Sequence, residues 1–200
     1  NSAEQVRYVT AHCDARVSFA DTPAQVAKFV AEEARMPLLE VVVQMVGEPE
    51  ANGGGGRLRV LGWNEFLKIG DKASDAALDE RIASQKPDDV CTLIYTSGTT
   101  GEPKGAMLTH GNMMSNCGPL TPLFGITSKD VALSFLPLSH VLERQANFCM
   151  VVGGAHVYFA ESVEAVPNNL MEVRPTLLAS VPRLFEKIKA RVLDKVAQDN

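Results

Sequence analysis

Short, almost continuous apolar runs alternate with helical patterns along the chain, and this alternation restricts the fold more than any other feature of the sequence. The runs at residues 38–46, 90–95 and 176–179 are typical of buried strands. Such strands, separated by helices, predict a mostly parallel sheet that is covered by helices, and therefore an α/β fold. Because 46% of the 200 residues are hydrophobic, the chain can form a real core, and its length fits one domain or one large part of a domain.

Capping and turn residues set the expected boundaries of the elements. Thr22, followed by Pro23, is a good N-cap with proline at the first helical position. We expect helices at residues 3–12, 23–35, 63–83, 112 onward, 141–152, 164–173 and 182 onward, and strands at residues 15–20, 38–46, 90–95, 106–109, 131–136, 155–159 and 176–179.

Residues 47–57 form a glycine-rich segment, GEPEANGGGGR, which predicts a flexible surface loop. Four consecutive glycines invite comparison with a phosphate-binding loop. No helix start follows them, however, so the linker interpretation is favoured.

Charge and cysteine content argue against several classes of function. The net charge of −5 and the lack of a basic run disfavour a nucleic-acid-binding protein. The four cysteines (Cys13, Cys91, Cys117 and Cys149) are far apart and form no CxxC pair, which favours buried free thiols over disulfides or a zinc site. No segment approaches the roughly 20 apolar residues of a transmembrane helix. No signal peptide is recognisable, and the expected location is cytoplasmic.

The stretch Thr96–Gly105, TSGTTGEPKG, follows the apolar run VCTLIY and predicts a loop that holds an anion. It contains three glycines, four hydroxyl side chains and one lysine. Gly98 and Gly101 permit positive φ angles, so backbone N–H groups can approach a phosphate closely. Lys104 adds a cationic point charge.

Two familiar phosphate-binding patterns do not match this stretch. A Walker loop needs Gly-Lys-Ser/Thr leading into a helix, whereas here Pro103 precedes Lys104 and the residues after Gly105 are expected to be extended. No GxGxxG sequence opens a helix, so the Rossmann fingerprint is also excluded.

TSGTTGEPKG resembles the phosphate loop of adenylate-forming (AMP-binding) enzymes, the group of acyl-CoA synthetases, luciferases and peptide-synthetase adenylation domains. The segment Phe135–Arg144, FLPLSHVLER, resembles the next motif of that family. The segment Ser180–Ile188, SVPRLFEKI, is similar to part of the long-chain fatty-acyl-CoA synthetases. The resemblance covers nearly the whole chain. It implies that residues 1–200 are one partial domain, a fragment of the large N-terminal domain of such an enzyme.

The resemblance implies a two-step ligase reaction with ATP, Mg²⁺ and coenzyme A. A fatty-acid carboxylate attacks the α-phosphate of ATP to give acyl-AMP and pyrophosphate, and the coenzyme A thiol then displaces AMP. Because the carboxylate is already a nucleophile, catalysis would rest on positioning and on stabilisation of the phosphate charges.

Site residues follow from the same resemblance. His140 would line the acyl pocket, although by its position alone it is as well explained as a helix-start residue with local hydrogen bonds. Glu143 and Arg144 are expected as a surface or interhelix pair, His110 as a cap of the next helix, and His12 and His156 as structural residues. The residues implied to bind ATP are Thr96, Ser97, Gly98, Thr99, Thr100, Gly101, Lys104 and Gly105, with Lys104 and Thr100 as catalytic groups and Thr96 as a ligand of Mg²⁺.

Later motifs of the family are not found in this sequence. They are the Tyr-Gly-x-Thr-Glu-like motif, the aspartate that binds ribose, and the mobile C-terminal domain with its catalytic lysine. The chain also starts at Asn1 without a methionine and ends inside a helical pattern. We therefore expect a fragment that is inactive alone.

The leading hypothesis is a fragment of an ATP-dependent fatty-acid–CoA ligase whose partners are small-molecule substrates. One alternative is an adenylate-forming enzyme for an aryl or amino acid, and another is a non-catalytic nucleotide-binding module. Acyl chain length, oligomeric state and peripheral membrane association remain open at this point.

Overall fold

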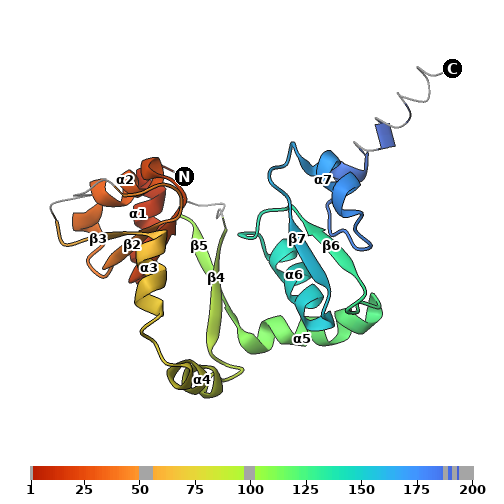
Figure 1. Cartoon of the computed structure of the whole chain (residues 1–200), viewed down its shortest axis with the longest axis horizontal. Helices are drawn as coiled ribbons and strands as arrows, with labels where there is room; N and C mark the ends of the chain where they lie inside the picture. The colour runs from red at the N-terminus through yellow and green to blue at the C-terminus, as the bar shows by residue number, and fades with distance from the viewer. Residues whose placement is uncertain (1, 50–55, 97–101, 187–188, 191–192, 194–200) are drawn as a thin grey trace. The chain divides into compact units, whose positions relative to one another are not determined.

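The computed structural model describes residues 2–49, 56–96, 102–186, 189–190 and 193. The chain divides into two compact units, one made of Asn1–Lys86 with Tyr95–Ala106 and the other of Pro87–Ile94 with Met107–Asn200 (Figure 1). The elements in chain order are α1 (Ala3–His12), β1 (Val17–Ala20), α2 (Pro23–Ala31), the 3-10 turn η1 (Glu33–Arg35), β2 (Val41–Gln44), β3 (Arg59–Gly62), α3 (Trp63–Gly70), α4 (Asp75–Ser84), β4 (Val90–Thr96), β5 (Lys104–Thr109), α5 (His110–Leu123), β6 (Val131–Ser134), α6 (Val141–Gly153), β7 (His156–Phe159) and α7 (Val166–Val173).

The first unit is built on a parallel sheet with the strand order β1-β2-β3. The central strand β2 is buried at the consecutive residues Val42, Val43 and Gln44, and α2 packs on both β1 and β2 while α1 packs on α2. The core consists of Ala20, Val26, Phe29, Met36, Leu39, Val42 and Leu58. Parallel pairing with helical cover confirms the predicted α/β class.

The strand β3 and the break between α3 and α4 differ from the sequence-based expectation. The expected helix at residues 63–83 is two helices, because Ser74 starts the second one by accepting a hydrogen bond from the N–H of Ala77 at 3.3 Å. β3 was not expected at all. Its apolar residues are few, and it pairs with β2 from across the glycine-rich segment.

The end of the glycine-rich segment is held to the first unit by charged side chains. Arg57 donates to the carbonyl oxygens of Leu39 and Met36 at 2.7 and 2.9 Å, and Glu33 accepts from the N–H of Leu58 at 2.8 Å. Residues 50–55 lie outside the described part of the chain, so the predicted flexibility stays a prediction.

Thr22 occupies the N-cap position of α2 without capping it through its side chain. Its hydroxyl instead donates to Asp21 at 3.3 Å. The expected N-cap residue is therefore at the right position, but α2 starts with proline at N1 and without the side-chain hydrogen bond.

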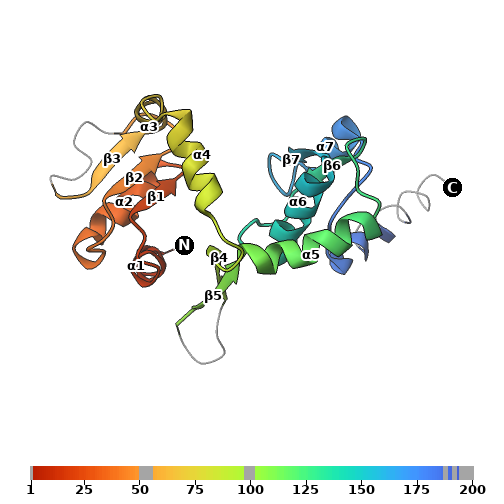
Figure 2. The same ribbon diagram turned by 90° about the horizontal axis from the view of Figure 1, so that it is seen from below.

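The second unit contains the parallel pair β6–β7 and the packed helices α5 and α6 (Figure 2). Its buried apolar residues include Met113, Cys117, Leu133, Cys149 and Met150. The expected strand at residues 176–179 is present only as an isolated parallel bridge between Leu177 and Ala132.

β4 and β5 form a two-stranded sheet of their own. The N–H of His110 donates to the carbonyl of Asp89 at 3.1 Å, and the N–H of Gly111 to that of Pro87 at 2.7 Å. These bonds join residues just before β4 to residues just after β5, so the start of β4 lies beside the end of β5 and the pair is antiparallel. The end of β4 and the start of β5 therefore lie at the same end of the sheet.

Candidate functional site

The two flanks of the predicted phosphate loop are described, and its centre is not. Ser97, Gly98, Thr99, Thr100 and Gly101 lie outside the described residues. Thr96 ends β4 and Lys104 begins β5, and both side chains are exposed. In an antiparallel pair these two residues lie at the same end of the sheet, so both flanks of the predicted loop are at that end.

Gly105 lies against the ring of Tyr95. A Cβ atom at this position would stand 3.1 Å from Cζ of Tyr95, which is closer than ordinary van der Waals contact. The glycine therefore allows β5 to approach the tyrosine ring directly beside Lys104.

Two side chains of α1 contact the flanks of the loop. The Tyr8 hydroxyl donates to the carbonyl oxygen of Pro103 at 2.9 Å, and Nδ1 of His12 lies 2.8 Å from the Tyr95 hydroxyl. Tyr8 and His12 also stack, with ring centroids 5.3 Å apart. Sequence reasoning assigned His12 a structural role and did not single out Tyr8 or Tyr95. Nothing in the sequence links residues so far apart.

His140 is the N-cap of α6. Its Nδ1 accepts from the N–H of Leu142 at 3.2 Å, and its side chain is exposed. This geometry fits the alternative that the sequence position of His140 suggested, a helix-start residue with local hydrogen bonds. His140 is not among the residues that line the cavity described below, and its role in a substrate pocket stays a prediction.

Glu143 and Arg144 do not form the expected pair. Glu143 is 1% exposed, and its Oε1 accepts from the Ser134 hydroxyl at 2.5 Å, while Oε2 has no hydrogen-bond partner. Arg144 instead donates to the carbonyl of Leu138 at 2.9 Å and to the hydroxyl of Thr92. Neighbouring residues of a helix point to different faces, so Glu143 and Arg144 contact different parts of the chain.

His110 is the first residue of α5 and not its cap. Thr109 caps the helix by accepting from the N–H of Asn112 at 3.1 Å, and Asn112 returns a bond to the N–H of Thr109 at 3.0 Å. This reciprocal arrangement is a capping box.

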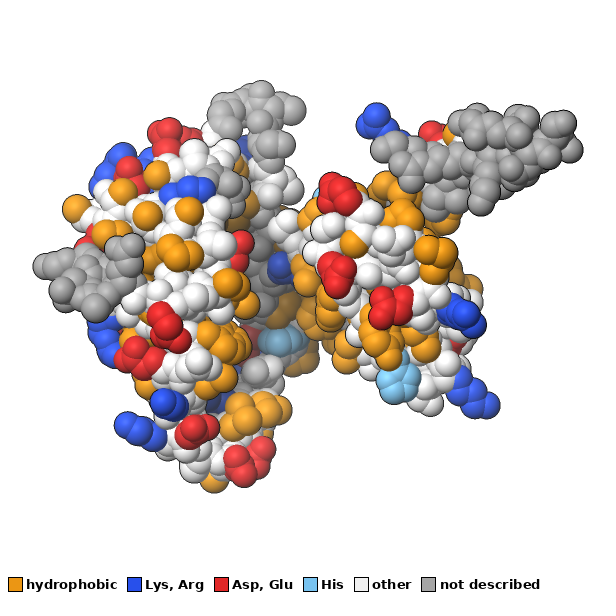
Figure 3. All heavy atoms as spheres, turned by 45° about the horizontal axis from the view of Figure 1, so that its top comes forward, with side chains coloured by type: hydrophobic (Ala, Val, Ile, Leu, Met, Phe, Trp, Pro, Cys, Tyr) orange, Lys and Arg blue, Asp and Glu red, His pale blue; other side chains and the backbone are white. Residues whose placement is uncertain are grey.

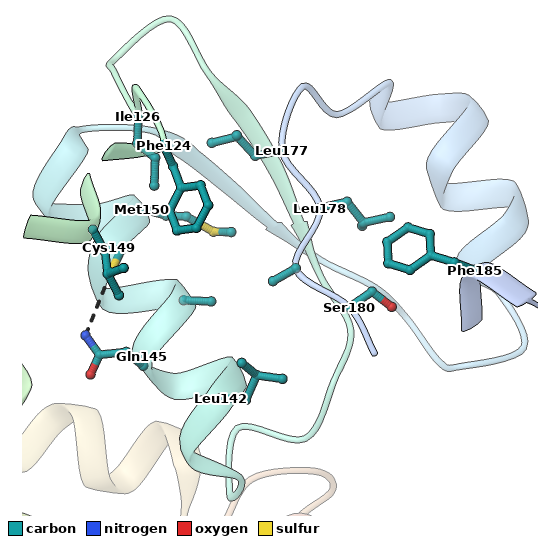
Figure 4. A pocket seen from close by; sticks show the side chains of 13 residues that line it. Phe124, Ile126, Leu142, Gln145, Cys149, Met150, Leu177, Leu178, Ser180 and Phe185 are labelled. Atoms are coloured by element: carbon teal, nitrogen blue, oxygen red, sulfur yellow. Dashed lines mark hydrogen bonds between the residues drawn. The ribbon is translucent and has the colours of Figure 1, made fainter. Parts of the chain in front are cut away.

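An apolar cavity of about 420 Å³ lies within the second unit (Figure 4). One wall is the face of α6 that carries Leu142, Gln145 and Cys149, and another is the extended segment Leu177–Ser180. The hydroxyl oxygen of Ser180 is buried there without a hydrogen-bond partner. The other lining residues are Leu120, Phe124, Ile126, Ala146, Met150 and Phe185. Sequence reasoning found the segments that supply these residues but not the cavity, because its walls meet only in the folded chain.

Cys117 and Cys149 meet beside this cavity, although they are far apart in the sequence. Their sulfur atoms are 3.6 Å apart, and Gln145 donates to the sulfur of Cys117 at 3.0 Å. Burial, together with the hydrogen bond to Cys149, raises the pKa of the Cys117 thiol to about 11. All four cysteines are free, as predicted, but only Cys117 and Cys149 are buried, whereas Cys13 and Cys91 are half-buried.

Among the residues that the structure describes, no group of three or more His, Cys, Asp or Glu side chains could hold a metal ion. Thr96 offers a single hydroxyl. Mg²⁺ binds proteins through one or two carboxylates together with substrate phosphates, so Thr96 alone does not form a magnesium site. Within the same residues, no helix has the length and apolar character needed to span a membrane.

A comparison with protein families shows to which family the chain belongs. The model of the family described as "AMP-binding enzyme" matches residues 1–200. The chain belongs to this family. The resemblance found in the loop TSGTTGEPKG is thereby confirmed for the chain as a whole.

The curated relatives of the chain include long-chain-fatty-acid–CoA ligases. The ligase ACSBG2 of Xenopus laevis is 36% identical over 202 residues, which are 96% of this chain and 26% of the relative. The human ligase ACSBG1 is 35% identical over 208 residues, 99% of this chain and 28% of the relative. The chain thus spans about a quarter of the length of these family members.

Solved structures of other adenylate-forming enzymes share the fold. The anthranilate CoA ligase AuaEII, in complex with anthranoyl-AMP, has a TM-score of 0.73 at 20% identity and covers 89% of this chain and 33% of its own. The A-PCP didomain of carboxylic acid reductase from Segniliparus rugosus, in complex with AMP, has a TM-score of 0.74 at 21% identity. The match covers 99% of this chain and 30% of the didomain chain. At these identities the likeness shows the fold of the family alone.

Proposed function

We propose that this chain is part of an ATP-dependent long-chain fatty-acid–CoA ligase. The observation that supports this most directly is the family match over residues 1–200, together with curated relatives that are long-chain-fatty-acid–CoA ligases. In the first step a carboxylate oxygen of the fatty acid attacks the α-phosphorus of ATP, and pyrophosphate leaves. In the second, the sulfur of coenzyme A attacks the acyl carbonyl carbon, and AMP leaves.

The proposed role of the loop is electrostatic. Lys104 would hold the β- and γ-phosphates while pyrophosphate departs, with Thr100 and the neighbouring backbone N–H groups of the loop as further donors. An exposed ammonium group at the start of β5 is free to turn toward a phosphate. Such fixed donors lower the barrier by stabilising charge that develops on the phosphate oxygens.

Mg²⁺ would enter as the complex with ATP, and its main ligands would be phosphate oxygens. Thr96 would supply one hydroxyl from the end of β4. The chemistry supplied by the ion is neutralisation of phosphate charge.

The apolar cavity of the second unit is the proposed site for the acyl chain. Its volume of about 420 Å³ falls within the usual range of small-molecule sites, and its walls are almost entirely apolar. A long hydrocarbon chain gains free energy from removal of apolar surface from water, so a cavity of this character favours a fatty acid over an amino acid.

Other acids and a non-catalytic role remain testable alternatives. An aryl or amino acid would replace the fatty acid if the acyl cavity were not used. A nucleotide-binding module would bind ATP without releasing pyrophosphate.

The test is release of AMP and pyrophosphate by the full-length protein with ATP, coenzyme A and acids of increasing chain length. We expect turnover with long-chain acids, and Lys104→Ala to reduce it at least tenfold. Lys129→Ala, which removes another exposed lysine, serves as the control and should leave the rate unchanged. Turnover with aryl or amino acids alone would support the first alternative, and ATP binding without turnover the second.

A second experiment tests the cavity. Ala146 lines it, so Ala146→Phe should fill part of it and shift the preference toward shorter acids. Val151 lies on the same helix at 67% exposure and outside the lining residues, so Val151→Phe is the matched control. An unchanged chain-length preference in Ala146→Phe would refute this assignment of the cavity.

A further inference from the structure

We propose that Tyr8 and His12 of α1 are positioning residues for Lys104. They hold the residues on both sides of the loop, Tyr95 and Pro103, and so fix where the lysine stands. The inference rests on the proposed function, because it assigns α1 a part in binding ATP.

Tyr8 acts on the residue next to Lys104. Its hydroxyl donates to the carbonyl oxygen of Pro103 at 2.9 Å in a partly buried contact. The proline ring already fixes φ of Pro103, so a hydrogen bond at its carbonyl also restrains the peptide that leads into Lys104. The lysine side chain itself stays exposed and free to meet a ligand.

His12 acts on the other flank. Its Nδ1 lies 2.8 Å from the hydroxyl of Tyr95. Burial, with a smaller contribution from Cys13, raises the pKa of Tyr95, and its hydroxyl shares one hydrogen bond with the imidazole of His12.

Both contacts are made by side chains of the same helix, α1. Tyr8 and His12 are four residues apart on α1, so they lie on one face of the helix and their rings stack. α1 begins with a capping box between Ser2 and Gln5, which fixes its first turn. The ring of Tyr95 in turn packs against Gly105, directly after Lys104. Movement of Lys104 relative to the first unit would therefore break contacts on both sides.

A purely structural role predicts a different result from a positioning role. If these contacts served the fold alone, their loss would lower stability without a selective effect on ATP. If they position Lys104, their loss weakens the grip on ATP and leaves the fatty-acid site unaffected, because binding depends on preorganised donors.

The experiment measures KM for ATP, KM for the fatty acid and the thermal midpoint of the full-length protein. Tyr8→Phe keeps the ring and removes the hydroxyl, and we expect KM for ATP to rise about threefold to tenfold, the range that corresponds to one lost hydrogen bond. His12→Ala should have an effect of the same size. His12→Gln, which can offer an acceptor to Tyr95, should restore part of the affinity. KM for the fatty acid should stay within twofold.

Tyr158→Phe and His156→Ala are the matched controls, since both side chains are exposed in the second unit on β7. They should leave KM for ATP unchanged. An unchanged KM for ATP in Tyr8→Phe and His12→Ala overturns the proposal, as does an equal rise of both KM values together with a lower thermal midpoint.

Direct binding of a fluorescent ATP analogue separates this inference from the proposed function. If the protein turns over another class of acid, the fatty-acid assignment fails, while a selective loss of ATP affinity in the two variants still supports the positioning role. If the variants bind the analogue as tightly as the wild type, the positioning role fails whatever the acid substrate is.

Discussion

At the scale of single residues, the buried polar groups of the second unit show more about how its elements are held together than the exposed charges do. Glu143 is almost fully buried, and no cation pairs with it among the described residues. Its Oε1 accepts from Ser134 on β6 and from the side chain of Asn147 on α6, at 2.5 and 3.3 Å. The Glu143 side chain thereby ties α6 to β6.

Removal of this carboxylate should cost stability. We expect Glu143→Ala to lower the free energy of unfolding by about 3 kcal/mol, because it leaves a cavity and takes the acceptor from Ser134. Glu143→Gln keeps a carbonyl oxygen for both donors and should cost at most about 1 kcal/mol. Urea denaturation measures both values. Equal losses in the two variants would show that the hydrogen bonds do not matter.

The Cys117 thiol should resist alkylation in the folded protein. Its side chain is fully buried, and its pKa is raised to about 11, chiefly by burial. The thiolate is the reactive form, so at pH 8 almost none is present. Mass spectrometry after treatment with iodoacetamide should find Cys13 and Cys91, which are half-buried, modified well before Cys117. All four should react in urea. Equal rates for Cys117 and Cys13 in the native state would contradict the described packing.

At the scale of elements, hydrogen bonds from loop residues determine how the strands of the second unit are held. Asp130 precedes β6 and accepts from the N–H and hydroxyl of Thr127 at 2.8 and 2.9 Å. Its other oxygen accepts from the Thr176 hydroxyl at 2.8 Å, while the N–H of Thr176 donates to the carbonyl of Val131. The carboxylate thus joins the turn before β6 to the extended segment that follows α7.

These bonds make the stability depend on pH. The N–H of Thr127, followed by the hydroxyls of Thr176 and Thr127, lowers the pKa of Asp130 in the folded state. A lowered pKa contributes stability above the unfolded value of about 3.9, and this contribution is lost as the pH falls through the folded value. Asp130→Asn should therefore lower the thermal midpoint at pH 7, with a difference from wild type that shrinks below about pH 4.

The control for this prediction is Asp79→Asn, at an exposed position on α4. Its thermal midpoint should follow that of the wild type at every pH. A difference between wild type and Asp130→Asn that stays constant from pH 7 to pH 3 would rule out ionisation of Asp130 as the cause.

At the scale of the whole molecule, the two units leave many large apolar side chains on the surface. Figure 3 shows such side chains among charged groups on both units. Phe19, Leu78 and Ile82 of the first unit and Val151 and Phe159 of the second are each more than half exposed. Exposed apolar groups of this kind are common on folded proteins when they are scattered singly among charged ones.

We expect the 200-residue chain alone to show no ATP–pyrophosphate exchange, whereas a full-length protein should show it with a long-chain acid. The physical reason is that the proposed phosphate binding by the loop would not by itself hold the ribose or bring the acid to the α-phosphate. Exchange is measured with labelled pyrophosphate, with Lys104→Ala as the control. Lysine-dependent exchange by the 200-residue chain would disprove the expectation.

Local sequence determined the elements and the family. Apolar periodicity predicted most helices and strands because these depend on contacts between near neighbours, as at α1, α6 and β4. The loop TSGTTGEPKG pointed to the adenylate-forming enzymes because it resembles the phosphate loop of that family, and two later segments resemble further parts of it. Misplaced boundaries, such as the break at Ser74, arose where one capping residue outweighed a continuous helical pattern.

Only the tertiary structure decided which distant residues meet. Tyr8 and Pro103 are 95 residues apart, and Cys117 and Cys149 are 32 apart, yet each pair is in contact. The burial of Glu143 depends on β6 lying against α6, and the apolar cavity depends on residues 177–180 lying beside α6. Such contacts follow from the packing of whole elements, and packing leaves no local pattern from which they can be predicted.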